Sequence, residues 1–207
     1  MCIRDSSMAR KKEIRRQQIL DVAYNLALSE GIESLTARNI AQAGDFSTQP
    51  IYLEFKNMED LRTQVLEIIS VNLKTKILQK SYTGGALIDL DLSYINFAKE
   101  HVDLFRAMFV DGKLGSAIIA DTLLNLGIEK FNEEYSKYNL SEKKTKQVVM
   151  ANWISATGIA ALIINQVATF SEEQIVNVLK AQILDAIDNE NLSQVENNPM
   201  FSTSDKE

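Results

Sequence analysis

The stretch LTARNIAQAGDFSTQPIYLEFK, residues 35–56, decides the predicted fold. Thr36 and Ser47 are favourable N-cap residues, and each precedes a short segment that can form a helix, to about Ala43 and to about Leu53. Only the turn Gly44-Asp45-Phe46 separates the two segments, and its phenylalanine can pack between the helices. Two short helices this close together are typical of a helix-turn-helix that binds DNA.

The second short helix has the chemistry of a helix that reads the major groove. Ser47, Thr48 and Gln49 occupy its N-cap and first turn. Glutamine can bind adenine with two hydrogen bonds, a threonine methyl can touch a thymine methyl, and serine can donate to a phosphate. Tyr52 can present its hydroxyl, and Lys56 its charge, to the DNA backbone. We predict that these five residues contact DNA, with a half-buried packing role as the alternative for Tyr52.

The charge distribution agrees with a DNA-binding N-terminal part, although the whole chain of 207 residues has a net charge of −6. Residues 1–56 hold eight basic and seven acidic side chains, and residues 57–207 hold 14 and 21. The acidic excess therefore belongs to the second part alone. Five basic residues fall within seven positions of the first part: Arg10, Lys11, Lys12, Arg15 and Arg16. A solvated helix start is the alternative for this cluster.

Helical periodicity dominates the rest of the chain. Further helices are predicted over about 9–29, 57–80, 87–101, 104–109, 116–138, 141–168 and 171–189. With the two short segments this makes nine helices and no convincing strand. Asn57 and Ser171 are the expected caps of two of them, Ser171 in a capping box with Gln174.

The composition argues against an enzyme. One cysteine and one histidine exclude a zinc site built on thiols or histidines and leave little for acid–base catalysis. We expect no cofactor. The uncharged stretch Val148–Val167 is as long as a membrane span, but five of its positions are polar, so we interpret it as a buried helix. We therefore expect a cytoplasmic protein without a membrane segment.

The chain resembles the TetR/AcrR family of transcriptional regulators over residues 19–66. The matching residues keep their order and spacing: Ile19-Leu20, Gly31, Leu35-Thr36, Arg38, Ile40-Ala41, Phe46-Ser47, Ile51-Tyr52, Phe55-Lys56 and Leu61. Three positions depart from the family pattern. Asp45 stands where the family has its turn glycine, Ala27 replaces an aromatic residue, and Glu54 places an acid near the expected phosphates.

The resemblance implies a fold and a set of roles. The third helix would read the major groove, and Arg38 would join the five DNA-facing residues named above. Residues 9–56 would form the DNA-binding domain and 57–190 an effector-binding and dimerisation domain, between a leader, 1–8, and a flexible tail, 191–207. The last two long helices would form a four-helix interface in a homodimer. Gly158 agrees with this, because a helical glycine is unfavourable unless something packs closely on it.

The resemblance also implies a pocket for a small-molecule effector. Aromatic, methionine and polar residues predicted on the inner helix faces are its candidates: Tyr94, Phe97, His101, Phe105, Met108, Met150, Trp153 and Thr157. A core role is the alternative for most of them, and a structural helix end for His101.

The function that follows is a repressor that a small molecule releases from a palindromic operator. Two other classes stay open. A helical protein-interaction module with weakened DNA binding would account for Asp45 and Glu54, whereas a small helical enzyme has no catalytic motif to support it. Replacing Gln49 with alanine distinguishes the repressor from the interaction module, because only a protein that reads DNA should lose affinity for one operator position.

Overall fold

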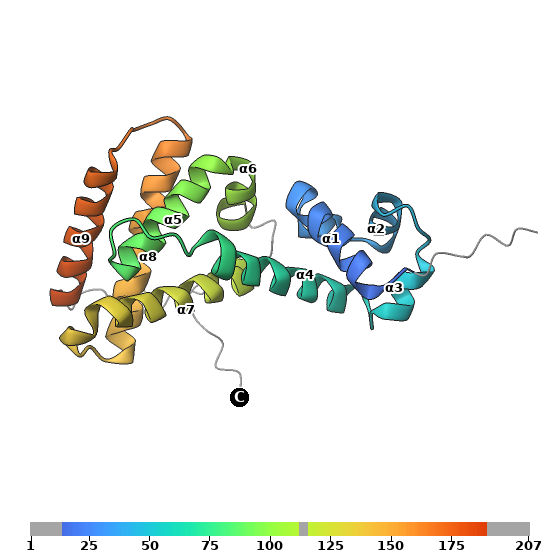
Figure 1. Ribbon diagram of the computed structural model, residues 1–207, viewed down its shortest axis with the longest axis horizontal. Coiled ribbons are helices and arrows are strands. Elements are labelled where there is room, and N and C mark those ends of the chain that lie inside the picture. Colours follow the sequence, from blue (N-terminus) through green and yellow to red (C-terminus); the bar gives the residue numbers. More distant parts are fainter. Residues whose placement is uncertain (1–13, 112–115, 190–207) are drawn as a thin grey trace, which may run out of the picture. The chain divides into compact units, whose positions relative to one another are not determined.

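The computed structural model describes residues 14–111 and 116–189 (Figure 1). Within these residues the chain forms nine α-helices and no strand, which confirms the predicted all-α class. The chain divides into two compact units between Val65 and Leu66. The expected leader, the expected tail and the basic residues Arg10, Lys11 and Lys12 lie outside the described residues.

The first unit contains three helices and the beginning of a fourth. They are α1 (Arg16–Glu30), α2 (Ala37–Ala43), α3 (Gln49–Glu54) and α4 (Met58–Asn72). Helix α1 contacts both α2 and α3. Ile19, Ile40, Ile51 and Leu61 each supply a fully buried side chain to the core of this unit.

Two helix starts differ from the prediction. Helix α1 begins at Arg16 rather than near residue 9, because Arg15 has an extended backbone and no side chain caps the helix. The expected cap by Ser47 is also wrong: Thr48 is the N-cap of α3, and no side chain bonds there. A Ser47 cap would have to bond the N–H of the second or third following residue, and the third, Pro50, has no N–H.

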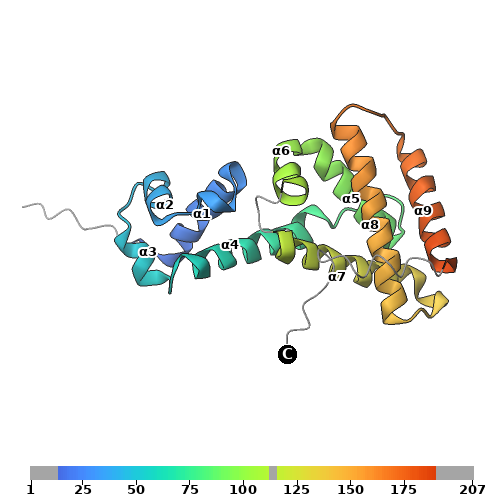
Figure 2. The same ribbon diagram turned by 180° about the vertical axis from the view of Figure 1, so that it is seen from behind.

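The second unit continues α4 through a π-helical turn, Leu73–Ile77, into a helical bundle (Figure 2). The bundle helices are α5 (Ala86–Glu100), α6 (Val102–Phe105), α7 (Ser116–Tyr135), α8 (Glu142–Ile164) and α9 (Glu172–Asp188). Helix α5 packs against α7 and α8, and α8 runs beside α9 in both views. Apolar and acidic side chains alternate over Ile88–Leu92, a pattern that also occurs in strands, but these residues lie inside α5.

Serine side chains cap two helices of this unit. Ser141 accepts a hydrogen bond from the Lys144 N–H, and Ser171 and Gln174 form the predicted capping box. Among the described helices, α8 alone is long and apolar enough to cross a membrane, and 44% of its most apolar window is buried inside the fold. Core helices of globular proteins meet the same length and composition criteria.

Asp89, on α5, holds the loop that leads into that helix. Its carboxylate accepts hydrogen bonds from Ser81 Oγ (2.9 Å), Thr83 N (2.7 Å), Thr83 Oγ1 (2.8 Å) and Gly84 N (3.1 Å). Gly84 has a φ of +82°, which glycine adopts at little cost. Burial alone would raise the pKa of Asp89, but the hydrogen bonds outweigh it and hold the pKa below the ordinary value.

We expect Asp89→Asn to lower the free energy of unfolding at pH 7 by about 1–3 kcal/mol, because an amide cannot accept all four hydrogen bonds. The carboxylate stabilises the folded state above pH 4, and this contribution is lost as the pH falls through its lowered pKa. The difference between wild type and variant should therefore shrink in acid. Urea unfolding at several pH values measures it, with Asp121→Asn, at an exposed position of α7, as the control. An equal effect of both variants would contradict the assignment.

Candidate functional site

The turn between α2 and α3 is built on a close contact between a glycine and an aromatic ring. A Cβ added to Gly44 would lie 2.1 Å from Cε1 of Phe46, so only glycine allows the ring to occupy this place. Asp45 follows with a φ of +53°, in the left-handed region that aspartate tolerates better than most residues. The departure from glycine at this position therefore leaves the turn intact.

Helix α3 has one buried and one exposed face. Ile51 and Phe55 are buried in the first unit, whereas Tyr52 is 64% exposed and Leu53 is 76% exposed. The exposure of Tyr52 excludes a half-buried packing role in the described chain. Leu53 was not among the predicted contact residues, because an apolar residue in a short helix is usually assigned to the core.

All six predicted DNA-contact residues are exposed in the structure. Ser47, Thr48 and Gln49 lie at the N-terminal end of α3, Tyr52 lies within it, and Lys56 directly follows it. Arg38 is on α2, in the same unit. Pro50 lies in the first turn of α3 and has no N–H to donate. The helix loses no hydrogen bond by this, because the first N–H groups of a helix have no partner within it.

Arg16, one of the five basic residues of the N-terminal run, has a structural role. Its guanidinium donates to the carbonyl oxygen of Glu54 and to Gln64 Oε1 (2.9 Å). It also lies over the ring of Phe55, 4.3 Å from the ring centroid. These contacts connect α1 to the end of α3 and to α4. The charge run in the sequence could not show this, since the partners are about 40 to 50 positions away.

The beginning of α4 fixes the chain immediately after the exposed helix. Asn57 Oδ1 accepts a hydrogen bond from Asp60 N (2.8 Å), as the sequence predicts. The Asp60 carboxylate accepts from the Lys56 N–H (3.0 Å) and from Gln64 Nε2 (2.7 Å). These two hydrogen bonds lower the pKa of Asp60. The backbone of Lys56 is thus held in place while its side chain stays exposed.

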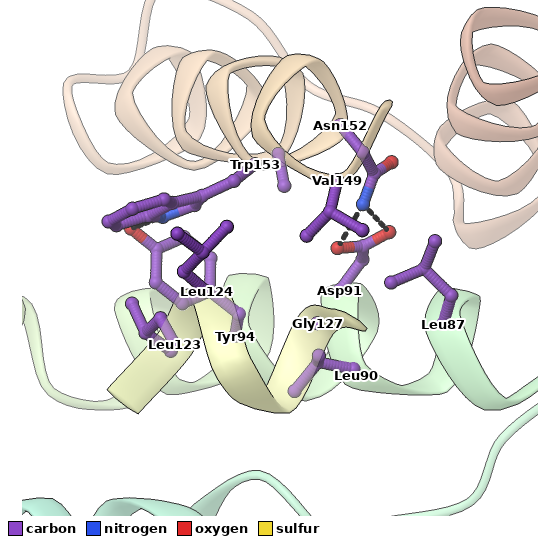
Figure 3. A pocket seen from close by; sticks show the side chains of 11 residues that line it. Leu87, Leu90, Asp91, Tyr94, Leu123, Leu124, Gly127, Val149, Asn152 and Trp153 are labelled. Atoms are coloured by element: carbon purple, nitrogen blue, oxygen red, sulfur yellow. Dashed lines mark hydrogen bonds between the residues drawn. The ribbon is translucent and has the colours of Figure 1, made fainter. Parts of the chain in front are cut away.

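The second unit contains a small cavity between α5, α7 and α8 (Figure 3). Its volume is about 30 Å³. Leucine and valine side chains form most of the wall, and the polar groups come from Asp91 and Tyr94 on α5 and from Asn152 and Trp153 on α8. Helices α7 and α8 approach each other closely beside the cavity. A Cβ added to Gly127 would lie only 2.6 Å from Val149 Cγ1.

The polar side of this cavity is a carboxyl–amide pair. Asn152 Nδ2 donates to both carboxylate oxygens of Asp91, at 2.9 Å each. The exposed fractions are 5% for Asp91 and 2% for Asn152. Asn152 Oδ1 is buried and has no hydrogen-bond partner among the described residues. Burial, together with the nearby negative charge of Glu134, outweighs the hydrogen bonds from Asn152 and raises the pKa of Asp91 to about 8.

The predicted effector residues do not form one group. Tyr94 and Trp153 line the small cavity, and Thr157 Oγ1 lies 3.1 Å from the Tyr94 hydroxyl. Phe97 and His101 instead line a separate hollow beside Lys76 and Lys80. The remaining three predicted residues, Phe105, Met108 and Met150, are buried in the core. Helical spacing predicts inward faces for all eight, but it cannot tell a cavity wall from a filled core, and His101 is exposed.

Sequence reasoning missed Asp91 and Asn152. The available signal was an acid inside the apolar run Ile88–Leu92 and an amide inside an uncharged helix. Asp89 lies in the same run but binds the loop that precedes α5. The run alone therefore does not indicate which of the two acids lines a cavity.

Comparison with known proteins places the first unit in a family. Residues 19–65 match the family model described as bacterial regulatory proteins, tetR family. This segment belongs to the tetR family. Among curated proteins, none matches the chain.

Solved structures extend the likeness to the fold of both units. A TetR-like transcriptional regulator from Rhodococcus sp. RHA1 aligns with 86% of this chain and 98% of its own, with a TM-score of 0.52 and 13% identity. MexZ, a repressor responsible for antibiotic resistance in Pseudomonas aeruginosa, aligns with 83% of this chain and 94% of its own, with a TM-score of 0.55 and 11% identity. At these identities the likeness shows the fold alone: that of TetR-family transcriptional regulators.

The raised pKa of Asp91 predicts how the stability of this chain depends on pH. The folded state binds a proton at Asp91 that the unfolded chain, with a pKa near 3.8, releases. This contribution to stability is complete below pH 4 and is lost as the pH rises toward 8.

We therefore expect Asp91→Asn, which keeps the shape of the side chain, to gain stability relative to wild type as the pH rises from 4 to 8. Thermal unfolding across this range measures the difference, and Asp121→Asn serves again as the charge-matched control. A pH-independent difference between Asp91→Asn and wild type would show that Asp91 titrates normally.

Proposed function

We propose that this chain is a dimeric transcriptional repressor that leaves a near-palindromic DNA operator when a small molecule binds its second unit. The proposal depends on helix α3. One face of this helix is buried in the unit that contains the tetR-family segment, and its other face is exposed. The protein would act in the cytoplasm, where it meets DNA, and would need no cofactor.

The exposed residues suit distinct parts of a DNA site. Thr48 and Gln49, in the first turn of α3, have the side chains that read thymine methyls and adenine edges. Ser47, Tyr52, Lys56 and Arg38 carry hydroxyl or cationic groups that suit phosphates. Glu54 is half-buried and its carbonyl oxygen binds Arg16, so an acid in this helix is compatible with a DNA-facing surface.

Dimerisation would involve α8 and α9, which lie side by side (Figures 1 and 2). Ile154, Gly158 and Leu162 are exposed and recur every four residues, so they share one face of α8. No described residue lies within 4 Å of the place where a Cβ on Gly158 would be. On α9, Val178 and Leu184 are also exposed. A second copy of the chain would cover these apolar side chains and supply the close contact at the glycine.

Release from DNA would be a shift in population. Helix α4 contains residues of both units, since the division between them falls inside it. A ligand that binds one arrangement of the second unit better than another would favour that arrangement and could move the two α3 helices out of register with the operator. A dimer needs half-sites about 34–36 Å apart, one turn of DNA.

We expect the wild-type protein to shift a DNA fragment that contains the upstream region of its own gene. Gln49→Ala should weaken binding by about 1–3 kcal/mol, an effect lost when the adenine it reads is replaced. Tyr52→Phe should weaken binding to all sequences alike, because it removes a phosphate contact. Fluorescence anisotropy at fixed salt measures both, with Tyr82→Phe, in the second unit, as the control.

The opposite results favour the interaction module. Absence of a shift at low salt with folded protein would overturn the proposal, as would equal affinity of wild type and Gln49→Ala for every operator variant.

Gly158→Leu is expected to convert the dimer to a monomer without unfolding it. The chain has room for the new side chain, and leucine is a better helix former than glycine by about 1 kcal/mol. In a dimer, however, leucine would force the facing helices apart. Sedimentation at micromolar concentration measures the change, with Glu67→Leu, at an exposed position of α4, as the control. A monomeric wild type, or a variant that dimerises equally well, would contradict the interface.

A further inference from the structure

The cavity of the second unit contains a buried acceptor that no donor of the described residues satisfies. Asp91 offers two carboxyl oxygens, which receive hydrogen bonds from one amide nitrogen, Asn152 Nδ2. Asn152 Oδ1 is a further acceptor without a partner, on a side chain only 2% exposed. Leaving such an acceptor buried and unpaired is unfavourable, and a ligand with N–H donors would supply the missing hydrogen bond.

The described residues place no cation against Asp91. The charged and titratable groups that act on it are Glu134 and Tyr135 on α7 and Tyr94 on its own helix, while α8 faces it with the neutral Asn152. Glu134 adds negative charge, and burial keeps both tyrosines neutral by raising the pKa of each. The site therefore favours a positive charge from outside the chain.

The walls limit the rest of the ligand. Leu87, Leu90, Leu123, Leu124 and Val149 are buried aliphatic side chains, and Tyr94 and Trp153 add aromatic rings on one side (Figure 3). Aromatic rings attract cations as well as apolar groups. A volume of about 30 Å³ accepts a water-sized group, so a larger ligand has to displace leucine side chains.

We propose that this cavity binds the protonated nitrogen of a small alkylamine, with the ammonium group against Asp91 and Asn152 and a short apolar chain among the leucines. The inference rests on the proposed function for its regulatory meaning, whereas the binding itself does not require DNA. The ammonium would donate to the carboxylate of Asp91 and to Asn152 Oδ1.

Binding should release a proton. At neutral pH the buried carboxyl of Asp91 is protonated, because its pKa is about 8. The amine arrives already protonated, so the carboxyl proton passes to solvent as the ammonium–carboxylate pair forms. The affinity for an amine should therefore rise by about tenfold per pH unit up to about pH 8 and then level off.

The chain has a single tryptophan, and Trp153 lines the cavity, so its fluorescence reports occupancy directly. Titration of the full chain with n-butylamine at pH 7.5 should give a saturable change. The neutral n-butanol, of the same chain length, should bind at least about tenfold more weakly. Asp91→Asn should abolish this preference, and Asp121→Asn should preserve it.

Equal affinity for the amine and the alcohol would overturn the proposal. So would amine binding that is independent of pH between 6 and 8, or that survives Asp91→Asn unchanged. The first two comparisons use the wild-type protein, so they decide the question even if the variant does not fold. If the amine binds but the protein does not shift operator DNA, only the proposed function is refuted. If the protein shifts operator DNA but the amine does not bind, only this inference is refuted.

Discussion

The burial of one face of α3 is the constraint on which the candidate DNA-binding surface depends. A helix of six residues has no stability of its own in water, and no side chain caps this one. Ile51 and Phe55 hold it by burying apolar surface, and Arg16 adds contacts to the Phe55 ring and to the carbonyl oxygen of Glu54. Because these contacts take one face of the helix, Gln49, Tyr52 and Leu53 are displayed on the rest of it.

The second unit shows how position decides the chemistry of like residues. Asp89 and Asp91 are two positions apart on α5, and both are buried. Asp89 faces a loop whose backbone and hydroxyl groups supply four donors, so its charge is stabilised and its pKa is lowered. Asp91 faces a single amide in an apolar wall, so its charge is disfavoured and its pKa is raised. One acid thereby stabilises the fold, and the other would be available to the proposed ligand.

Helix α8 takes part in both proposed sites of the second unit, the ligand cavity and the dimer interface. Helix α8 contributes to the cavity through Asn152 and Trp153 and exposes Ile154, Gly158 and Leu162 on another face. The same helix would therefore connect the ligand site to the proposed dimer interface. Since packed helices move as units, a ligand that shifts α8 would act on the interface as well.

The sequence by itself determined the helical class, the approximate place of the described helices and the position of the short turn, because helix periodicity and capping are local properties. It placed the starts of α1 and α3 too early. Thr36, Asn57 and the Ser171–Gln174 pair could all be predicted as caps for this reason. The tetR-family segment was also readable, since its residues recur at fixed spacing.

Tertiary structure alone decided which polar side chains are exposed and which are paired. Arg16 belongs to a charge run in the sequence but packs on Phe55, and Asp91 is separated from Asn152 by 61 positions. Such pairs depend on how helices pack, and each helix face accepts many partners of similar polarity. The sequence therefore specified the helices and the exposed character of α3 only in outline, whereas packing alone created the acceptor-rich cavity.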